Sequence, residues 1–173
     1  MAISNEQRTH IAKTHIDSDV LRGMLDTTDT DDLCVVGKHL RNSIKKNNPL
    51  GVSIPSIGEA FHTLCEDTDL NQTEKCRNAA GMLHKLIQEG KIELVGIGKD
   101  KRVYQIAKEL MDEDQKLKPA DAIILSVACD SNECASFYTT DRVLLDGIKI
   151  AGVARIHSVN IQEPPYSERR RRR

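Results

Sequence analysis

One apolar segment constrains the fold of this chain more than any other: residues 122–129, AIILSVAC, contain no charge and a single hydroxyl side chain. An apolar run of this length, with Pro119 just inside its start, predicts a helix that is buried on most of its sides. A carboxylate, Asp121, lies in the first turn of this helix, and a second, Asp141, follows a short predicted strand over residues 135–139. A carboxylate at the edge of an apolar core is costly unless it is protonated, paired or bound to a cation. We therefore expect the rest of the chain to supply partners for these two acids.

Strands and helices are predicted to alternate along the chain. Short apolar segments between turn residues predict strands, and apolar residues three and four positions apart predict helices. The predicted strands cover residues 13–17, 50–54, 91–95, 135–139 and 148–153, with a weaker candidate at 157–161. The predicted helices cover residues 18–25, 33–46, 56–65, 72–89, 101–114 and 119–129. This alternation predicts an α/β fold, a three-layer α/β/α sandwich with a mainly parallel central sheet.

The length of 173 residues predicts one domain, which we place at residues 13–162, after a polar lead-in at 1–12. Residues 163–173 form a tail with two prolines and five arginines, Arg169–Arg173. The formal net charge is −1, so the chain without these arginines carries −6. An acidic body with a basic tail leaves three interpretations open for the tail: phosphate contacts with a nucleic acid, a disordered terminus, or residues added by engineering.

Composition limits the classes of protein to consider. No apolar run approaches the roughly 20 residues that span a bilayer, and the N-terminus has no apolar signal-peptide core, so we expect a cytoplasmic protein without a membrane partner. The five cysteines form no CxxC pair, which favours reduced, mostly buried thiols over a disulfide framework or a zinc site.

Four acids are expected at one edge of the sheet, because ligands bind beyond the carboxyl ends of parallel strands. Asp17 ends the first predicted strand, where Ser18 or Asp19 can cap the next helix. Glu59 is placed in the first turn of the helix after the second strand, and Asp121 and Asp141 flank the fourth strand. Carboxylates in one partly dry site repel one another, and a hard cation such as Mg²⁺ or Mn²⁺ relieves that repulsion. The Ser18 and Thr139 hydroxyls are suited to orient a carboxylate or a metal-bound water.

Four segments resemble the PIN domain family in their order and spacing: HIDSDVLRGML (15–25), IPSIGEA (54–60), PADAIILSVA (119–128) and FYTTDRVLL (137–145). The resemblance covers residues 13–157 and implies a compact α/β metal-dependent ribonuclease, a class that includes toxins of VapBC-type pairs. It implies that the family's catalytic and metal-binding acids fall on Asp17, Glu59, Asp121 and Asp141, and its Thr-x-Asp threonine on Thr139. The chain departs from the family's common Asp-Thr-Asn with Asp17-Ser18-Asp19. Asp19 is then either an additional metal ligand or the N-cap of the following helix.

The resemblance implies RNA as substrate, Mg²⁺ or Mn²⁺ as cofactor and a homodimer, with an antitoxin protein as partner if the chain is a toxin. An alternative is a PIN domain that binds RNA in an RNA-processing assembly with little or no catalysis. A third, a phosphatase or flap-type DNA nuclease, would be expected to carry more acids and a helical arch.

Overall fold

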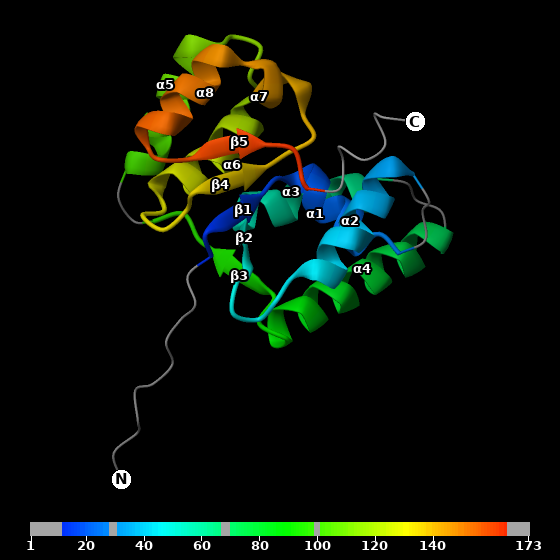
Figure 1. The fold of residues 1–173 in the computed structure, drawn as a ribbon. Coiled ribbons are helices and arrows are strands. Elements are labelled where there is room, and N and C mark those ends of the chain that lie inside the picture. The colour runs from blue at the N-terminus through cyan, green and yellow to red at the C-terminus, as the bar shows by residue number, and fades with distance from the viewer. Residues whose placement is uncertain (1–11, 28–30, 67–69, 99–100, 166–173) are drawn as a thin grey trace, which may run out of the picture.

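A five-stranded sheet organises the chain in the computed structural model, which describes residues 12–27, 31–66, 70–98 and 101–165. Most of the predicted lead-in and the arginines of the tail lie outside these residues. The strands are β1 (Thr14–Ile16), β2 (Leu50–Ser53), β3 (Ile92–Val95), β4 (Ser136–Tyr138) and β5 (Asn160–Gln162). All their pairings are parallel, and the order across the sheet is β3-β2-β1-β4-β5 (Figure 1). The predicted parallel α/β fold is confirmed.

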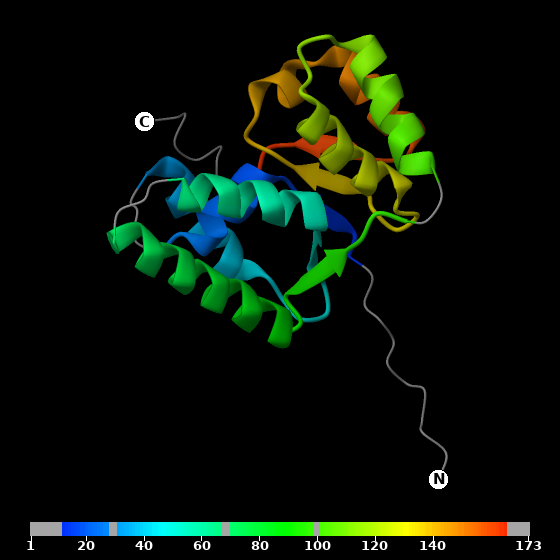
Figure 2. The same ribbon diagram turned by 180° about the vertical axis from the view of Figure 1, so that it is seen from behind.

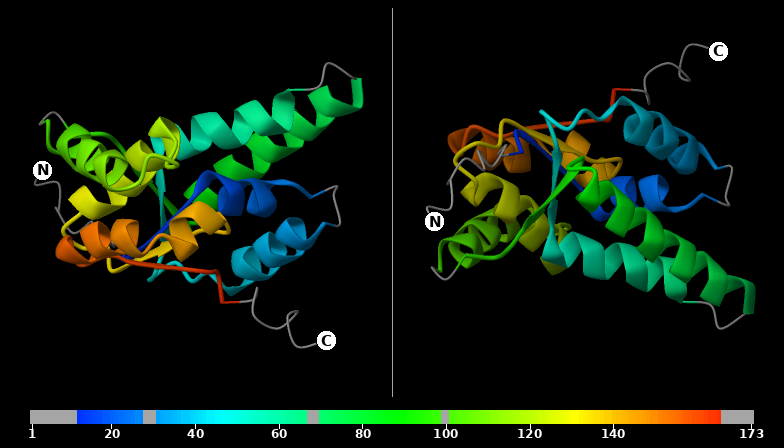
Figure 3. Two further views of the ribbon diagram at one scale, coloured as in Figure 1. Left: turned by 90° about the horizontal axis from the view of Figure 1, so that it is seen from above. Right: turned by 90° about the horizontal axis from the view of Figure 1, so that it is seen from below.

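Helices connect successive strands throughout the described part of the chain. They are α1 (Ser18–Leu25), α2 (Asp32–Ser43), α3 (Ile54–Cys65), α4 (Leu70–Gln88), α5 (Arg102–Glu113), α6 (Pro119–Asp130), α7 (Arg142–Asp146) and α8 (Ile148–Ile156). α3 and α4 pack as a hairpin that extends away from the sheet (Figure 3). None of the helices within the described residues is long and apolar enough to cross a membrane.

The buried apolar side chains divide into two clusters. The N-terminal cluster, from Ile16 to Ile92, joins α1–α4 to β1–β3, and the C-terminal cluster, from Ile106 to Val159, joins α5–α8 to β4. In β4, Phe137 belongs to the C-terminal cluster whereas Tyr138 packs against the N-terminal one. Because successive side chains of a strand point to opposite faces, the two clusters lie on opposite faces of the sheet at β4. Figures 1 and 2 show the corresponding two groups of helices.

The order in which strands are added to the sheet reverses its direction at β1. The chain runs outward from β1 through β2 to β3, then returns to add β4 and β5 on the other side of β1. The Asp17 amide donates to the Tyr138 carbonyl at 2.9 Å, so pairing of β1 with β4 continues to the carboxyl ends of both strands. In open α/β sheets such a switch point is where ligands bind. The fold therefore points to the ends of β1 and β4.

The apolar segment at 122–129 forms α6, and the prediction of a buried helix is confirmed. Eight of its residues are buried, among them Asp121, which is 9% exposed. α6 packs closely against α5. Because α6 also contacts α3 and β2, the carboxylate in its first turn is carried by a helix that is packed on several sides.

The prediction of a strand at 148–153 was wrong, because these residues belong to α8. Ile150, Val153 and Ala154 are buried at helical spacing, whereas Ile148 and Ile156 are 88% and 80% exposed. The β-branched residues favour a strand locally, but packing of one helical stripe against the core decides the outcome. The last strand, β5, overlaps the end of the weaker candidate at 157–161 and extends to Gln162.

The expectation of reduced thiols holds for three cysteines and fails for two. Cys34, Cys129 and Cys134 are buried and form no disulfide within the described residues. Cys65 and Cys76, which are 11 residues apart in sequence, form a disulfide between α3 and α4. Sequence spacing gave no signal for this pair, since only the packing of the α3–α4 hairpin brings the two side chains together.

Candidate active site

Asp17 and Thr139 meet at the carboxyl ends of β1 and β4. Thr139 Oγ1 donates to Asp17 Oδ2 at 2.7 Å, and both side chains are buried, Asp17 at 3% and Thr139 at 0% exposure. The same Thr139 oxygen accepts the Asp141 backbone N–H at 3.0 Å. One hydroxyl therefore connects two of the predicted site acids, which is the orienting role expected for Thr139.

Asp17 is also the N-cap of α1. Its Oδ1 accepts the Ser18 backbone N–H at 2.7 Å and lies 3.4 Å from the Ser18 hydroxyl. The prediction that Ser18 or Asp19 caps this helix was therefore wrong: the strand ends one residue earlier than predicted, so the helix begins at Ser18. Asp19, relieved of capping, lies in the first turn with a side chain that is 51% exposed.

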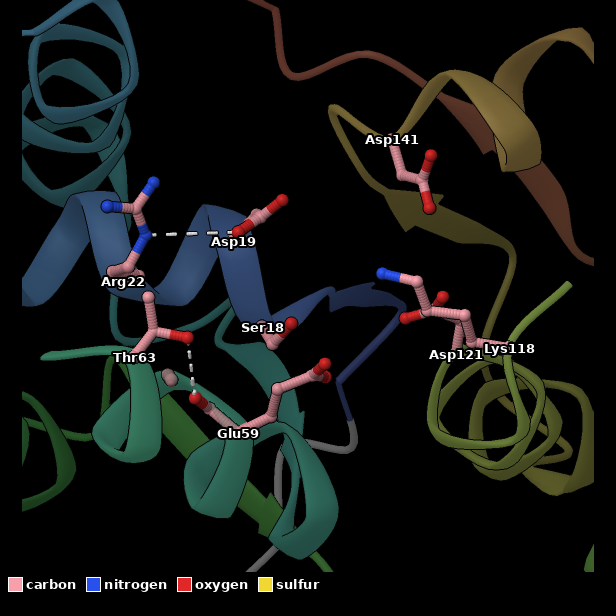
Figure 4. A pocket seen from close by; sticks show the side chains of 9 residues that line it. Ser18, Asp19, Arg22, Glu59, Thr63, Lys118, Asp121 and Asp141 are labelled. Carbon is pink, nitrogen blue, oxygen red and sulfur yellow. Dashed lines mark hydrogen bonds and ion pairs between the residues drawn. The ribbon is translucent and has the colours of Figure 1, made fainter. Parts of the chain in front are cut away.

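Four carboxylates line a pocket of about 210 Å³ beside this junction. They are Asp19 from α1, Glu59 from α3, Asp121 from α6 and Asp141 from the turn before α7. Figure 4 shows these side chains extending toward one space from separate elements, with Lys118 among them. The remaining lining residues are Ser18, Arg22, Ala60, Thr63 and Lys118. Asp17 is not a lining residue, so the structure places three of the four predicted acids at the pocket and the fourth at its hydrogen-bonded base.

Asp141 reaches the pocket from the turn that follows β4. Its Oδ1 accepts the Val143 backbone N–H at 2.8 Å and so caps the short helix α7. Together with the bond from its own N–H to Thr139, this fixes both the backbone and the carboxylate of Asp141. The side chain keeps acceptor capacity on its second oxygen.

Burial sets the electrostatics of the two acids nearest the core. It raises the pKa of Asp17 to about 7, even though the hydrogen bonds from Thr139 and Ser18 act in the opposite direction. Burial also raises the pKa of Asp121 to about 6. The charges of Glu59 and Asp141 add to that increase, and Lys118 opposes it. Both acids therefore take up protons near neutral pH unless a cation stabilises their charged forms.

One carboxylate oxygen of Glu59 lacks a hydrogen-bond donor among the described residues. This oxygen, Oε2, is buried. The expectation that Glu59 lies in the first turn was wrong, since Ser53 caps α3 and Glu59 falls in the second turn. A buried carboxylate oxygen without a donor is costly, so this oxygen is available to accept from a ligand in the pocket.

The acids fit a hard divalent cation in donor type, because all four present carboxylate oxygens to the pocket. Within the described residues, no three His, Cys, Asp or Glu side chains converge closely enough to hold a metal by themselves. Mg²⁺ commonly keeps several water ligands and takes only one or two carboxylates directly. Four carboxylates around a space of about 210 Å³ leave room for such waters.

Two cations at the pocket were not predicted as site residues. Arg22 follows Asp19 by one helical turn, and its Nε lies 3.8 Å from Asp19 Oδ1. Lys118 directly precedes Pro119 and stands three residues before Asp121. The i,i+3 spacing of Asp19 and Arg22 was a usable signal for a shared helix face. For Lys118 the signal was its position at the entrance to the buried helix.

Comparison of the sequence with models of known protein families gives no match, and comparison with curated proteins gives no significant match. The functional argument therefore depends on the geometry of the pocket and on the motifs in the sequence.

Proposed function

We propose that this protein is a metal-dependent endoribonuclease that hydrolyses phosphodiester bonds with Mg²⁺ or Mn²⁺. The observation that carries the proposal is the gathering of Asp19, Glu59, Asp121 and Asp141 around one pocket at the β1–β4 switch point. Nothing in the local helix and strand signals requires four like charges to face one space. Repulsion between the four carboxylates destabilises the folded state, and a bound cation would relieve it.

Separate roles follow from the environments of the acids. Asp121, Asp141 and Glu59 would hold the cation directly or through water, with Asp19 at the open side. Thr139 fixes Asp17 and the Asp141 backbone, so it acts as a positioning residue. When bound, a divalent cation would lower the pKa of a water molecule and stabilise charge on the phosphate oxygens. Asp17 lies beneath the pocket and adds negative potential there.

The test is cleavage of a labelled single-stranded RNA in Mg²⁺ or Mn²⁺, with and without EDTA. We expect cleavage that EDTA stops, and a loss of roughly 100-fold or more in Asp121→Asn. Asp146→Asn is the matched control, because Asp146 is exposed and lies outside the pocket. Circular dichroism checks that both variants remain folded. Equal activity in Asp121→Asn and Asp146→Asn would rule out this site.

A second candidate is an RNA-binding domain without cleavage. The observation that favours it is that no three potential ligand side chains converge within the described residues. This function would give RNA binding that is equal with Mg²⁺ and with EDTA, and no product over long incubation. Binding by filter retention, run beside the cleavage assay, separates the two functions.

A further inference from the structure

Two cations line the pocket, Arg22 and Lys118, and they differ in their contacts with its acids. Arg22 Nε lies 3.8 Å from Asp19 Oδ1 and so has a carboxylate partner. Lys118 also lines the pocket, yet it makes no ion pair of 4.0 Å or less with any described residue. Figure 4 shows its ammonium group extending into the space that Glu59, Asp121 and Asp141 surround.

The backbone of Lys118 is held at the start of α6, whereas its side chain makes no hydrogen bond to that helix. Lys118 is the N-cap of α6, with φ −71° and ψ 147°, and its carbonyl accepts the Ala122 N–H at 3.0 Å. The following Pro119 favours this extended conformation. The buried helix therefore anchors the Cα, and a flexible four-carbon stem carries the charge into the pocket.

A lysine that served only to neutralise the carboxylates would be expected in direct contact with one of them. Charge-assisted N–H···O bonds are short, about 2.7–2.9 Å, and a lysine stem is long and flexible enough to reach such a geometry. Lys118 instead stands among three carboxylates without pairing with any. This position suits a ligand that brings its own negative charge into the pocket.

A phosphodiester is such a ligand, and it needs a cation in the pocket to offset repulsion from the carboxylates. Its single negative charge is repelled by four carboxylates, so cations must balance both the acids and the phosphate. Arg22, on α1, forms an ion pair with Asp19, whereas Lys118, on the side of the pocket formed by α6, forms none with a described residue. Lys donates to phosphate oxygens as a point charge without strict geometry.

We propose that Lys118 binds a non-bridging oxygen of the RNA phosphodiester that enters the pocket, and so positions the strand over Asp121 and Asp141. This inference rests on RNA as the ligand of the proposed function, and it holds whether or not the RNA is cleaved. The contact is a substrate-binding one, separate from the carboxylates that would hold the cation.

The direct test is binding of a fluorescein-labelled single-stranded RNA, followed by anisotropy at several salt concentrations. The buffers contain either EDTA or Ca²⁺, and a denaturing gel checks that the probe stays intact. Lys118→Gln should bind roughly tenfold more weakly, with a slope of log K against log salt that is shallower by about 0.7. Lys118→Arg should keep both values close to those of the wild type. Lys116→Gln, an exposed lysine outside the pocket, is the control.

Kinetics give an independent readout if the RNA is cleaved. Lys118→Gln should then raise KM several-fold, and Lys118→Arg should restore it, whereas a purely structural role would not respond to the charge. If Lys118→Gln leaves the RNA affinity and the salt slope unchanged and only tightens Mn²⁺ binding, Lys118 is a counterion for the acids and the proposal is overturned.

The outcomes for Lys118 and for the nuclease are distinguishable. RNA binding that depends on Lys118 without any cleavage supports the Lys118–phosphate contact and contradicts the proposed nuclease activity. Cleavage with an unchanged salt slope in Lys118→Gln contradicts Lys118 alone. No binding of the RNA by the wild type in either buffer overturns the Lys118 contact.

Discussion

Thr139 and Asp17 are 122 residues apart in sequence and share a buried 2.7 Å hydrogen bond. The bond joins the carboxyl ends of β1 and β4, and the same threonine oxygen receives the Asp141 N–H. The Thr139 hydroxyl donates to Asp17 at the end of β1 and accepts from Asp141 in the turn after β4. It therefore fixes the positions of these two acids relative to each other. The stability of this junction should therefore depend on the hydroxyl rather than on the volume of the side chain.

Replacing Thr139 with Val keeps the shape and removes the donor. We expect Thr139→Val to lower the free energy of unfolding by about 1–3 kcal/mol at pH 8, where Asp17 is mostly ionised and needs the bond. Thr139→Ser, which keeps the hydroxyl, should lose less. Urea unfolding at pH 8 measures both. Equal losses in the two variants would mean that the methyl group, not the hydroxyl, is what matters.

Stability should fall as pH rises from about 4 to about 7 when no divalent cation is present. The folded-state pKa of Asp17 is raised to about 7 and that of Asp121 to about 6, both above the ordinary value of 3.8. Between these values each of the two acids binds more protons in the folded state than in the unfolded state, so their titration disfavours folding as pH rises. Burial lowers the pKa of His15 from 6.5 to about 4, which acts in the opposite direction but is smaller than the shifts of the two acids together. For Asp17 the slope is at most about 1.4 kcal/mol per pH unit. Unfolding in EDTA across this range measures it.

The matched variants for this pH dependence are Asp17→Asn and Asp146→Asn. Asp17→Asn removes one titrating group while keeping a residue that caps helices well, so the slope should become shallower. Asp146→Asn should leave the slope unchanged, because Asp146 is exposed. A wild-type stability that rises steadily from pH 4 to pH 7 would contradict the raised pKa values.

Glu59 should control the protonation of Asp121 across the pocket. After burial, the charge of Glu59 is the largest cause of the raised pKa of Asp121. Glu59→Gln should therefore lower the pKa of Asp121 below about 6 and also weaken Mn²⁺ binding, because one acidic ligand is lost. Carbon-detected NMR of the aspartate carboxyls measures the first effect and calorimetry the second. Glu109→Gln, an exposed change on α5, should produce neither.

Reduction should destabilise the protein through one pair of cysteines. The Cys65–Cys76 bond closes an 11-residue separation, and such a loop contributes about 2.8 kcal/mol in the chain-entropy model. Dithiothreitol should lower the unfolding free energy of the wild type by a similar amount. It should have no effect on the double variant Cys65→Ser/Cys76→Ser. Identical unfolding of the wild type with and without reductant would show that the bond does not form in solution.

The sequence predicted those features that depend on local pattern and strand order. The apolar run around Ile124 specified a buried helix, and alternation of strand and helix specified the parallel sheet. The segment at 148–153 was assigned wrongly because β-branched residues favour a strand until the buried stripe of Ile150, Val153 and Ala154 is known. Tertiary packing overrides local propensity there.

Within the candidate site, the sequence indicated the acids, but it did not indicate which acid caps a helix and which one lines the pocket. A one-residue difference in the end of β1 decides that Asp17 caps α1 and that Asp19 faces the pocket. Strand ends are the least reliable part of any sequence-based assignment. Lys118 was missed because the sequence does not show that its side chain lines the pocket without an ion pair to a described residue, which is a property of the folded structure.

The two hydrophobic clusters give the pocket a further property. Asp19 and Glu59 stand on helices of the N-terminal cluster, whereas Asp121 is carried by the C-terminal cluster and Asp141 follows β4. The acids are thus divided between two halves of the chain that meet along β1 and β4. The separations between the four acids therefore depend on how the two halves are held together, at the β1–β4 pairing and where α6 contacts α3 and β2.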